Sequence, residues 1–414
     1  MSNPVIMLIA FLSWIEISIN KTKLLCSSIT MYLAYIFFLF ATVSAIPTGR
    51  VEIVFPSVET SRSGVKSVKF RTLGEDVELK LEPAGDILAK DFAFYNGNHE
   101  KQHSVDVESL RRRLYRDRTT GAALLLDDDE QPPSIEGIVL PNLKITPHEW
   151  NEIIEGGKRA HRVEELTSDT NSYLSDNIIL PDFQREMVSF TRIDRNDKCI
   201  VIEVLLVTDR KFTERYETNE ALTEYVTLLS SVTETMLRQL DSGLQFRLLG
   251  IMTFTKETEP PLFEENKHPN GAYKPDVFGK IRDYFLENST SLSKKADIIA
   301  ILLTRSMRNR IEDSYSIEGL AYGGSVCSGN KVCVINGYVK AESAAGNLAH
   351  EMAHSLGVPH DGASPEKTGV SGSPGAKSCP GPDGFFMGAD RGAKVCVING
   401  YVKAESAAGN LAHE

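Results

Sequence analysis

Three histidines in the last quarter of the chain constrain its fold most strongly. His350 and His354 are four residues apart, so on an α-helix their imidazoles project from one face, a turn apart, and can bind one cation. Gly357 can end this helix at little cost by adopting a positive φ, which returns His360 as a third nitrogen ligand. Glu351 lies beside the first histidine. Three neutral imidazoles leave zinc an open fourth position, the arrangement of a catalytic site rather than a structural one.

This spacing is a specific signal. In a chain of 414 residues with 9 His, 30 Gly and 56 acidic residues, the pattern H-E-x-x-H-x-x-G-x-x-H arises by chance in about 4 of 100,000 chains. We therefore predict that the three histidines bind Zn²⁺ and that Glu351 accepts a proton from water and passes it on. The alternative is a chain that holds zinc but no longer catalyses a reaction.

The region before the histidines alternates strands with helices. Residues 199–208 and 296–304 are continuous apolar runs bounded by polar residues, which predicts strands buried on both faces, and residues 244–254 form a further strand. Residues 219–240 and 276–286 carry apolar side chains at helical spacing. This β-α-β-α-β order predicts an α/β fold with a largely parallel sheet flanked by helices.

Composition narrows the class of partner. The chain is 42% hydrophobic and 24% charged, as is typical of a folded protein. Its net charge of -11 argues against a nucleic-acid binder, because affinity for phosphate backbones comes mainly from clustered Lys and Arg. We expect protein or peptide partners and no nucleic acid.

The amino terminus resembles a secretion signal. Residues 32–42 form an apolar run that ends in Val43-Ser44-Ala45, which predicts cleavage after Ala45. Met31 directly precedes this run and is an alternative start. The run is shorter than the roughly 18 apolar residues of a spanning helix, so we expect a secreted, extracellular protein without stable membrane insertion. An uncleaved anchor is the other interpretation.

Secretion has consequences for cysteine and asparagine chemistry. Five of the six cysteines follow the cleavage site, and an oxidising compartment favours disulfides, with the pairs among Cys327, Cys333 and Cys379 left open. Asn288 begins the sequence Asn-Ser-Thr, a candidate glycosylation site.

The first part of the mature chain differs from the second. Residues 46–195 contain no cysteine and alternate strand-like pieces with polar breaks, which predicts a separate β-rich domain. Arg111, Arg112, Arg113 and Arg116 are interpreted as a surface patch. A minimal basic processing site, Arg-Ile-Asp-Arg, spans residues 192–195, where the composition changes.

These motifs carry a resemblance to a known family. Residues 350–361 resemble the metzincin zinc signature, and Asp361 after the third histidine is similar to the reprolysin (adamalysin) branch. Met387, within Gly-Phe-Phe-Met-Gly, matches the Met-turn that passes beneath the zinc in metzincins. Residues 115–147 resemble a reprolysin propeptide. Among reprolysins, the chain is most similar to the secreted salivary metalloproteases of blood-feeding arthropods such as ticks.

The resemblance implies a fold and a division into domains. It implies a metzincin-like catalytic domain, with a mostly parallel twisted sheet, an active-site helix and a small irregular lower lobe, preceded by a β-rich propeptide. The expected parts are a signal region at 1–45, the propeptide at 46–195, the catalytic domain at 196–389 and a duplicated segment at 390–414.

The resemblance also implies an activity. It implies a metalloendopeptidase that hydrolyses extracellular proteins, with Glu351 as general base, whereas the alternative is an inactive, secreted, metalloprotease-like binding protein. Substrate in this family lies antiparallel along an edge strand. We map this strand to Gly319, Leu320, Ala321, Tyr322, Gly323 and Gly324.

Two departures from the family pattern affect latency and metal content. Many reprolysin propeptides present a thiolate to zinc, yet no cysteine lies between Cys26 and Cys199. Latency is therefore expected to be steric or to use a non-thiol ligand. Glu203 and Asp297 are similar to two calcium ligands of some members, but the carboxy-terminal ligands have no counterpart, so we expect no Ca²⁺ there.

An identical repeat ends the sequence. Residues 331–351 recur letter for letter as residues 394–414. A single identical pair is not a solenoid architecture. The second copy carries His413 and Glu414 without a second or third ligand histidine, so it cannot hold zinc as the first copy does. We interpret it as a recent duplication or an assembly artefact.

Overall fold

The computed structural model describes most of the chain between residues 49 and 388. The ranges are 49–62, 64–140, 143–148, 154–165, 175–179, 200–240, 243–305, 307–308, 317–337, 341–367, 375–379 and 387–388. The expected signal region, the processing site at 192–195 and the second copy of the repeat all lie outside these residues.

One of the two large sheets is built from the first part of the chain. It has nine strands in the order β1-β13-β10-β9-β8-β7-β4-β3-β2, and its neighbours pair antiparallel. Hydrophobic residues alternate along these strands and form a core of their own. The strands are β1 (Val51–Val54), β2 (Ser57–Thr60), β3 (Lys66–Thr72), β4 (Glu75–Pro83), β7 (Leu114–Asp117), β8 (Ala122–Asp127), β9 (Ser134–Leu140), β10 (Leu143–Pro147) and β13 (His161–Glu165), beside the small hairpin β11 (Ile154–Glu155) and β12 (Lys158–Arg159).

The second sheet contains the predicted α/β core. Its eight strands run in the order β14-β18-β19-β17-β15-β16-β5-β6. The pairs among β16, β15, β17 and β19 are parallel, whereas β18 is antiparallel to β19. The strands are β5 (Leu88–Asn96), β6 (Lys101–Gln102), β14 (Ser175–Ile179), β15 (Ile200–Thr208), β16 (Leu244–Thr253), β17 (Ile298–Leu303), β18 (Ile317–Tyr322) and β19 (Val332–Asn336).

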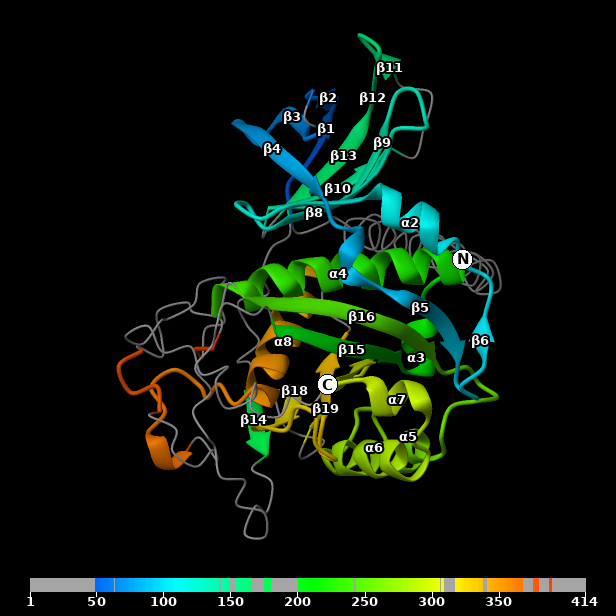
Figure 1. Ribbon diagram of the computed structural model, residues 1–414, viewed down its shortest axis with the longest axis vertical. Coiled ribbons are helices and arrows are strands. Elements are labelled where there is room, and N and C mark those ends of the chain that lie inside the picture. Colours follow the sequence, from blue (N-terminus) through cyan, green and yellow to red (C-terminus); the bar gives the residue numbers. More distant parts are fainter. Residues whose placement is uncertain are drawn as a thin grey trace, which may run out of the picture. The chain divides into compact units, whose positions relative to one another are not determined.

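The helices connect and cover these strands. The long helix α4 (Asn219–Leu240) packs against β16 and against α8 (Ala341–Ser355), and Figure 1 shows α4 running alongside β16. None of the described helices combines the length and the apolarity needed to cross a membrane. The others are η1 (Gly85–Ile87), α2 (Val107–Arg113), α3 (Arg210–Thr213), α5 (Leu262–Glu265), α6 (Asp276–Glu287), α7 (Ser291–Lys295) and η3 (Pro365–Lys367).

Periodicity located the elements of the second sheet well. The predicted helix at 219–240 coincides with α4, and the predicted strands at 199–208, 244–254 and 296–304 coincide with β15, β16 and β17 to within two residues at each end. All six residues of β17 are buried, as an unbroken apolar run predicts for a strand covered on both faces.

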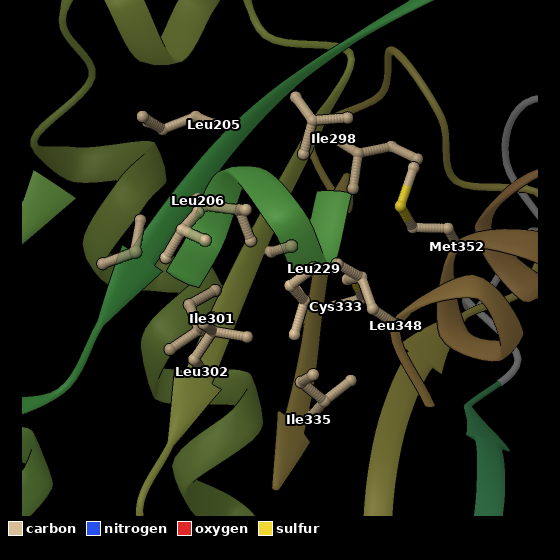
Figure 2. Close-up of a cluster of buried hydrophobic side chains, with 14 of the residues drawn as sticks. Leu205, Leu206, Leu229, Ile298, Ile301, Leu302, Cys333, Ile335, Leu348 and Met352 are labelled. Atoms are coloured by element: carbon tan, nitrogen blue, oxygen red, sulfur yellow. The ribbon is translucent and has the colours of Figure 1, made fainter. Parts of the chain in front are cut away.

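The central core fixes α8 to the sheet. In Figure 2 side chains from β15, β17 and β19 meet those of α4 and α8. Burying one Leu or Met side chain contributes about 1.5–3 kcal/mol, so these contacts hold the position of α8 firmly. The labelled residues are Leu205, Leu206, Leu229, Ile298, Ile301, Leu302, Cys333, Ile335, Leu348 and Met352.

Three strands from the first part of the chain belong to the second sheet. β5, β6 and β14 come from residues predicted to fold apart, yet they belong to the second sheet. β5 pairs in parallel with β16, with Ala93 opposite Gly250 and Asn96 opposite Thr253. Phe92 and Phe94 join the same core as the later strands. This pairing was not predicted, because apolar periodicity identifies a strand but not its partner.

Of the four arginines predicted to form a surface patch, Arg112 is exposed, Arg111 and Arg113 are half-buried, and Arg116 contradicts the prediction. Arg116 is buried and forms ion pairs with Glu82, Asp86 and Glu234, the last of which lies on α4. Arg111 donates hydrogen bonds to the backbone carbonyl groups of η1 and β5. A cluster of arginines in a sequence usually indicates an exposed surface. Here carboxylates distant in sequence surround Arg116, and their charges compensate the cost of burying it.

His161 in β13 makes the nine-stranded sheet sensitive to pH. Its side chain is buried, its Nε2 accepts a hydrogen bond from the Ile135 amide at 3.0 Å, and its Nδ1 lies 3.0 Å from the carbonyl oxygen of Arg159. This arrangement uses the neutral ring, and burial lowers the pKa of His161. The unfolded chain therefore binds the proton more readily than the folded chain does. The contribution of His161 to the free energy of unfolding is complete above about pH 6.5 and is lost as the pH falls below that value.

We expect hydrogen exchange at the Ile135 amide, corrected for its intrinsic rate, to accelerate between pH 7 and 5 because protonation of His161 removes the acceptor. His161→Gln should flatten this response, whereas His103→Gln, at an exposed histidine, should leave it unchanged. An equal pH response in wild type and His161→Gln would exclude this role.

Candidate metal centre

Helix α8 presents the first two histidines on one face. The segment is rich in Ala, which favours helix, and Leu348, Ala349 and Met352 are buried against the sheet and α4. His350 and His354 are each 1% exposed. Both rings are therefore held by surrounding structure before any metal binds.

The chain turns after α8 as predicted. Gly357 has φ of 90°, which confirms the expected left-handed conformation. Its amide donates to the carbonyl of His354 at 2.8 Å, and the Val358 amide donates to the carbonyl of Ala353 at 2.9 Å. This turn brings His360 back toward α8.

The three imidazoles meet at one point. The Nε2 atom of His360 lies 3.2 Å from Nε2 of His350 and 3.1 Å from Nε2 of His354. Among the described residues they form a group whose ligand atoms lie within 4.8 Å of one another. Nδ1 of His354 is 2.7 Å from the carbonyl oxygen of Val358, which can only accept, so Nδ1 carries the proton and Nε2 presents its lone pair. The close approach of three Nε2 atoms is the arrangement in which imidazoles bind a metal ion.

Glu351 lies between α8 and β18. Its side chain is 0% exposed, and a Cβ atom at Gly319 would lie 2.6 Å from both its Cγ and its Cδ. Only glycine at this position leaves room for the carboxylate. Burial raises the pKa of the Cys333 thiol on β19, and the negative charge of Glu351 raises it further. Sequence reasoning identified Gly319 as part of an edge strand but missed its contact with Glu351.

The segment predicted as the substrate-binding edge has two parts. Gly319, Leu320, Ala321 and Tyr322 belong to β18 and are buried, whereas residues 323–324 form the turn that follows. The Gly324 amide donates to the carbonyl of His354 at 2.9 Å, which ties this turn to α8.

β18 is not the edge of the sheet in this structure. β14 pairs with it in parallel on the side opposite β19, with Asp176 opposite Gly319 and Ile178 opposite Ala321. An earlier segment of the chain therefore occupies the position beside β18, and the role of this strand in binding substrate stays a prediction.

Met387 lies next to the third histidine. Its side chain is buried in the main core, and its carbonyl accepts a hydrogen bond from the Asp361 amide at 3.0 Å. Burial raises the pKa of Asp361 to about 6, and the charge on His360 opposes this shift. The hydrogen bond between Asp361 and Met387 attaches the backbone at Met387 to the loop that carries His360.

The two residues similar to calcium ligands are engaged by protein groups. Asp297 accepts the Glu203 amide at 2.8 Å and the Cys327 thiol at 3.1 Å. The ammonium group of Lys295 lies 3.8 Å from Oε1 of Glu203, so a protein cation already faces this carboxylate.

The structure describes three of the cysteines and the candidate glycosylation site. Cys327 and Cys333 carry free thiols and Cys379 is disulfide-bonded, so none of the pairs considered among these three is formed. Asn288, the predicted glycosylation site, is exposed at the end of α6.

Comparisons with known proteins agree with this geometry. The profile of Metallo-peptidase family M12 (Reprolysin_5) matches residues 200–395. A metalloproteinase of Tityus obscurus is 82% identical over 332 residues, covering 80% of this chain and 90% of the relative. The venom metalloproteinase antarease TserMP_A of Tityus serrulatus is 44% identical over 367 residues, covering 86% and 90%, and the venom metalloproteinase BumaMPs1 of Olivierus martensii is 35% identical over 374 residues, covering 86% and 89%.

These relatives correct one part of the expected resemblance. They are scorpion proteins, so an arthropod origin is shared, but a particular closeness to tick salivary enzymes is not shown. The family itself follows from identities that extend over most of both chains. This chain belongs to the M12 family of metallopeptidases.

Proposed function

We propose that the chain is a secreted zinc endopeptidase made as a zymogen, with a propeptide at 46–195 and a catalytic domain at 196–389. The observation that carries the proposal is the convergence of three imidazole Nε2 atoms, two of them from the helix that also carries the fully buried Glu351. The M12 family and the names of its venom relatives support protein substrates. The exposed side chain of Asn288 is compatible with glycosylation during secretion.

The three histidines would hold Zn²⁺, with the proton on Nδ1 of His354 fixing its orientation. When bound, zinc acidifies a water molecule and polarises the scissile carbonyl. Glu351 would accept the proton of that water and deliver it to the departing amine. Its position is set by α8 on one side and by the β18 backbone at Gly319 on the other.

Substrate recognition would use the backbone of β18. An extended peptide that adds antiparallel to this strand passes Gly319, and therefore Glu351. Met387 would support the third ligand through the loop that joins it to Asp361. The inactive binding protein considered above would bind a peptide along β18 without hydrolysing it, and hydrolysis that depends on the metal separates the two.

Removing the metal tests the endopeptidase directly. Chelation of the processed protein, freed of its amino-terminal fragment, should abolish hydrolysis of a denatured protein substrate, and one equivalent of Zn²⁺ per chain should restore it, because the histidines are already positioned. Hydrolysis that survives complete metal removal, or no hydrolysis by the metal-loaded protein freed of that fragment, contradicts the proposal.

Glu351→Gln should keep stoichiometric zinc but lower kcat at least ~100-fold, the size expected for loss of general acid and base catalysis. His354→Ala should lose both zinc and activity, since a ligand is removed. Metal content by atomic absorption and turnover of a quenched peptide check both. Full activity of zinc-loaded Glu351→Gln would remove Glu351 from the mechanism.

Gly319→Ala tests the contact that positions Glu351. The added Cβ displaces the carboxylate, so kcat should fall roughly 10- to 100-fold with zinc content unchanged. Gly279→Ala in α6, where a Cβ meets nothing within 4 Å, is the matched control and should leave kcat unchanged. In a Glu351→Gln background, Gly319→Ala should have no further effect on kcat. A further loss there would show that Gly319 acts by another route.

A further inference from the structure

One face of α4 is polar although the first part of the chain covers it. The face is formed by Glu224, Thr227, Ser230, Ser231 and Glu234, each of which has a neighbour in the group three or four residues away. Residues at this spacing lie on one side of a helix. The elements η1, β5 and β8, all from the first part of the chain, contact α4. We call these five residues the polar face of α4.

Three hydroxyl groups in the middle of the polar face are buried. Thr227, Ser230 and Ser231 are 0% exposed, and none of the described residues forms a hydrogen bond with their hydroxyl groups. A buried hydroxyl without a hydrogen bond costs about 1–3 kcal/mol. Permanent burial would favour apolar side chains at these positions. The composition of the polar face therefore fits a state of the protein in which this face meets water or a polar partner.

A carboxylate lies on each side of these hydroxyl groups along the helix, and each carboxylate binds an arginine. Nη2 of Arg113 is 2.6 Å from Oε1 of Glu224. Nη1 of Arg116 forms an ion pair with Oε2 of Glu234. The other oxygen of Glu234 lies 3.8 Å from Nη1 of Arg238 on the same helix, so only one of its two oxygens faces an arginine from outside α4. Two arginines three residues apart thus match the two carboxylates.

We propose that the polar face of α4 in the processed protein binds a segment of a protein substrate that carries two arginines three residues apart. This inference rests on the proposed function, because the face becomes accessible only when residues 46–195 have left. In the uncut chain Arg113 and Arg116 occupy the positions that the substrate arginines take afterwards.

The chemistry of the polar face favours an arginine-bearing polypeptide over other partners. Two carboxylates attract cations and repel phosphate groups. A guanidinium group has five N–H donors, so one arginine can bind a carboxylate and also donate to a hydroxyl group such as that of Thr227 or Ser231. An apolar partner would leave these hydroxyl groups without hydrogen bonds, as they are in the uncut chain.

Helix packing connects the polar face to the metal centre. Oγ1 of Thr233 in α4 lies 3.4 Å from the carbonyl oxygen of Ala345 in α8, the helix that carries His350 and His354. A substrate bound to α4 is therefore held on the same packed core as the metal ligands. Binding at this second site raises the effective concentration of the scissile bond at the first. KM should fall for long substrates, whereas peptides too short to reach α4 gain nothing.

Paired substrates test this preference. An unstructured polypeptide with one cleavable sequence carries either Arg-Leu-Tyr-Arg, the sequence of residues 113–116, or Ala-Leu-Tyr-Ala, at several distances along a flexible linker. The processed, zinc-loaded protein, freed of its amino-terminal fragment, should show about fivefold lower KM for the arginine substrate at the best linker length, with equal kcat. The difference should disappear in about 1 M NaCl. Equal KM values at low salt for every linker would overturn the proposal.

Neutral variants locate the preference on α4. Glu224→Gln combined with Glu234→Gln should raise KM for the arginine substrate to the value for the alanine substrate, because both charges that attract arginine are removed. Glu287→Gln, at an exposed acid on α6, is the matched control and should keep the difference between the substrates. If the double variant keeps the full difference, another surface recognises the arginines and the proposal is wrong.

A charge exchange controls for misfolding. Arg113→Glu combined with Glu224→Arg in the full chain keeps an ion pair at this position while the protein folds. After processing and removal of the amino-terminal fragment, this variant should prefer a substrate with Glu-Leu-Tyr-Arg over one with Arg-Leu-Tyr-Arg. An unchanged preference for Arg-Leu-Tyr-Arg would contradict the assignment of Glu224.

Binding measured without hydrolysis separates this inference from the proposed function. Zinc-loaded Glu351→Gln, processed and freed of its fragment, should bind the labelled arginine polypeptide about fivefold more tightly than the alanine polypeptide in fluorescence anisotropy. The uncut chain should show no difference, because Arg113 and Arg116 occupy the face. A difference in binding without any hydrolysis by the processed wild type rejects the protease and keeps the α4 site. Hydrolysis without any difference in binding rejects the α4 site alone.

Discussion

The whole site depends on holding three imidazole Nε2 atoms together at a single point. The fold supplies the constraint in two steps. The apolar face of α8 is fixed in the core against β19 and α4, and the turn at Gly357 then commits His360 to the same point. The free energy of the core, rather than of the site, maintains the geometry.

The position of β18 next to α8 also contributes to the geometry of the site. It is antiparallel to β19 in a sheet whose other central pairs are parallel, and it lies directly against α8. The missing side chain at Gly319 makes room for Glu351, so the strand proposed to bind substrate also positions the proposed base. In the proposed function, one backbone segment would both align the substrate and position the base, which would limit errors in the distance between the two.

Sequence reasoning recovered what is local and missed what is distant. The limits of α4, the burial of β17 and the left-handed Gly357 follow from spacing and from residue type, because neighbours within a few residues decide them. The convergence of the three histidines also followed, since a helix and one turn connect them. Arg116 could not be placed, because its burial depends on Glu234, more than a hundred residues later. The pairing of β5 with β16, and of β14 with β18, could not be predicted for the same reason. Apolar periodicity carries no information on the partner of a strand or on its direction.

These distant pairings address a general difficulty of a protease built on a sheet. A strand that binds substrate through its backbone must have free amide and carbonyl groups, and free strand edges also pair with other chains and aggregate. β14 and β5 pair with β18 and β16, the two outer strands of the group that follows residue 199, from within the same chain.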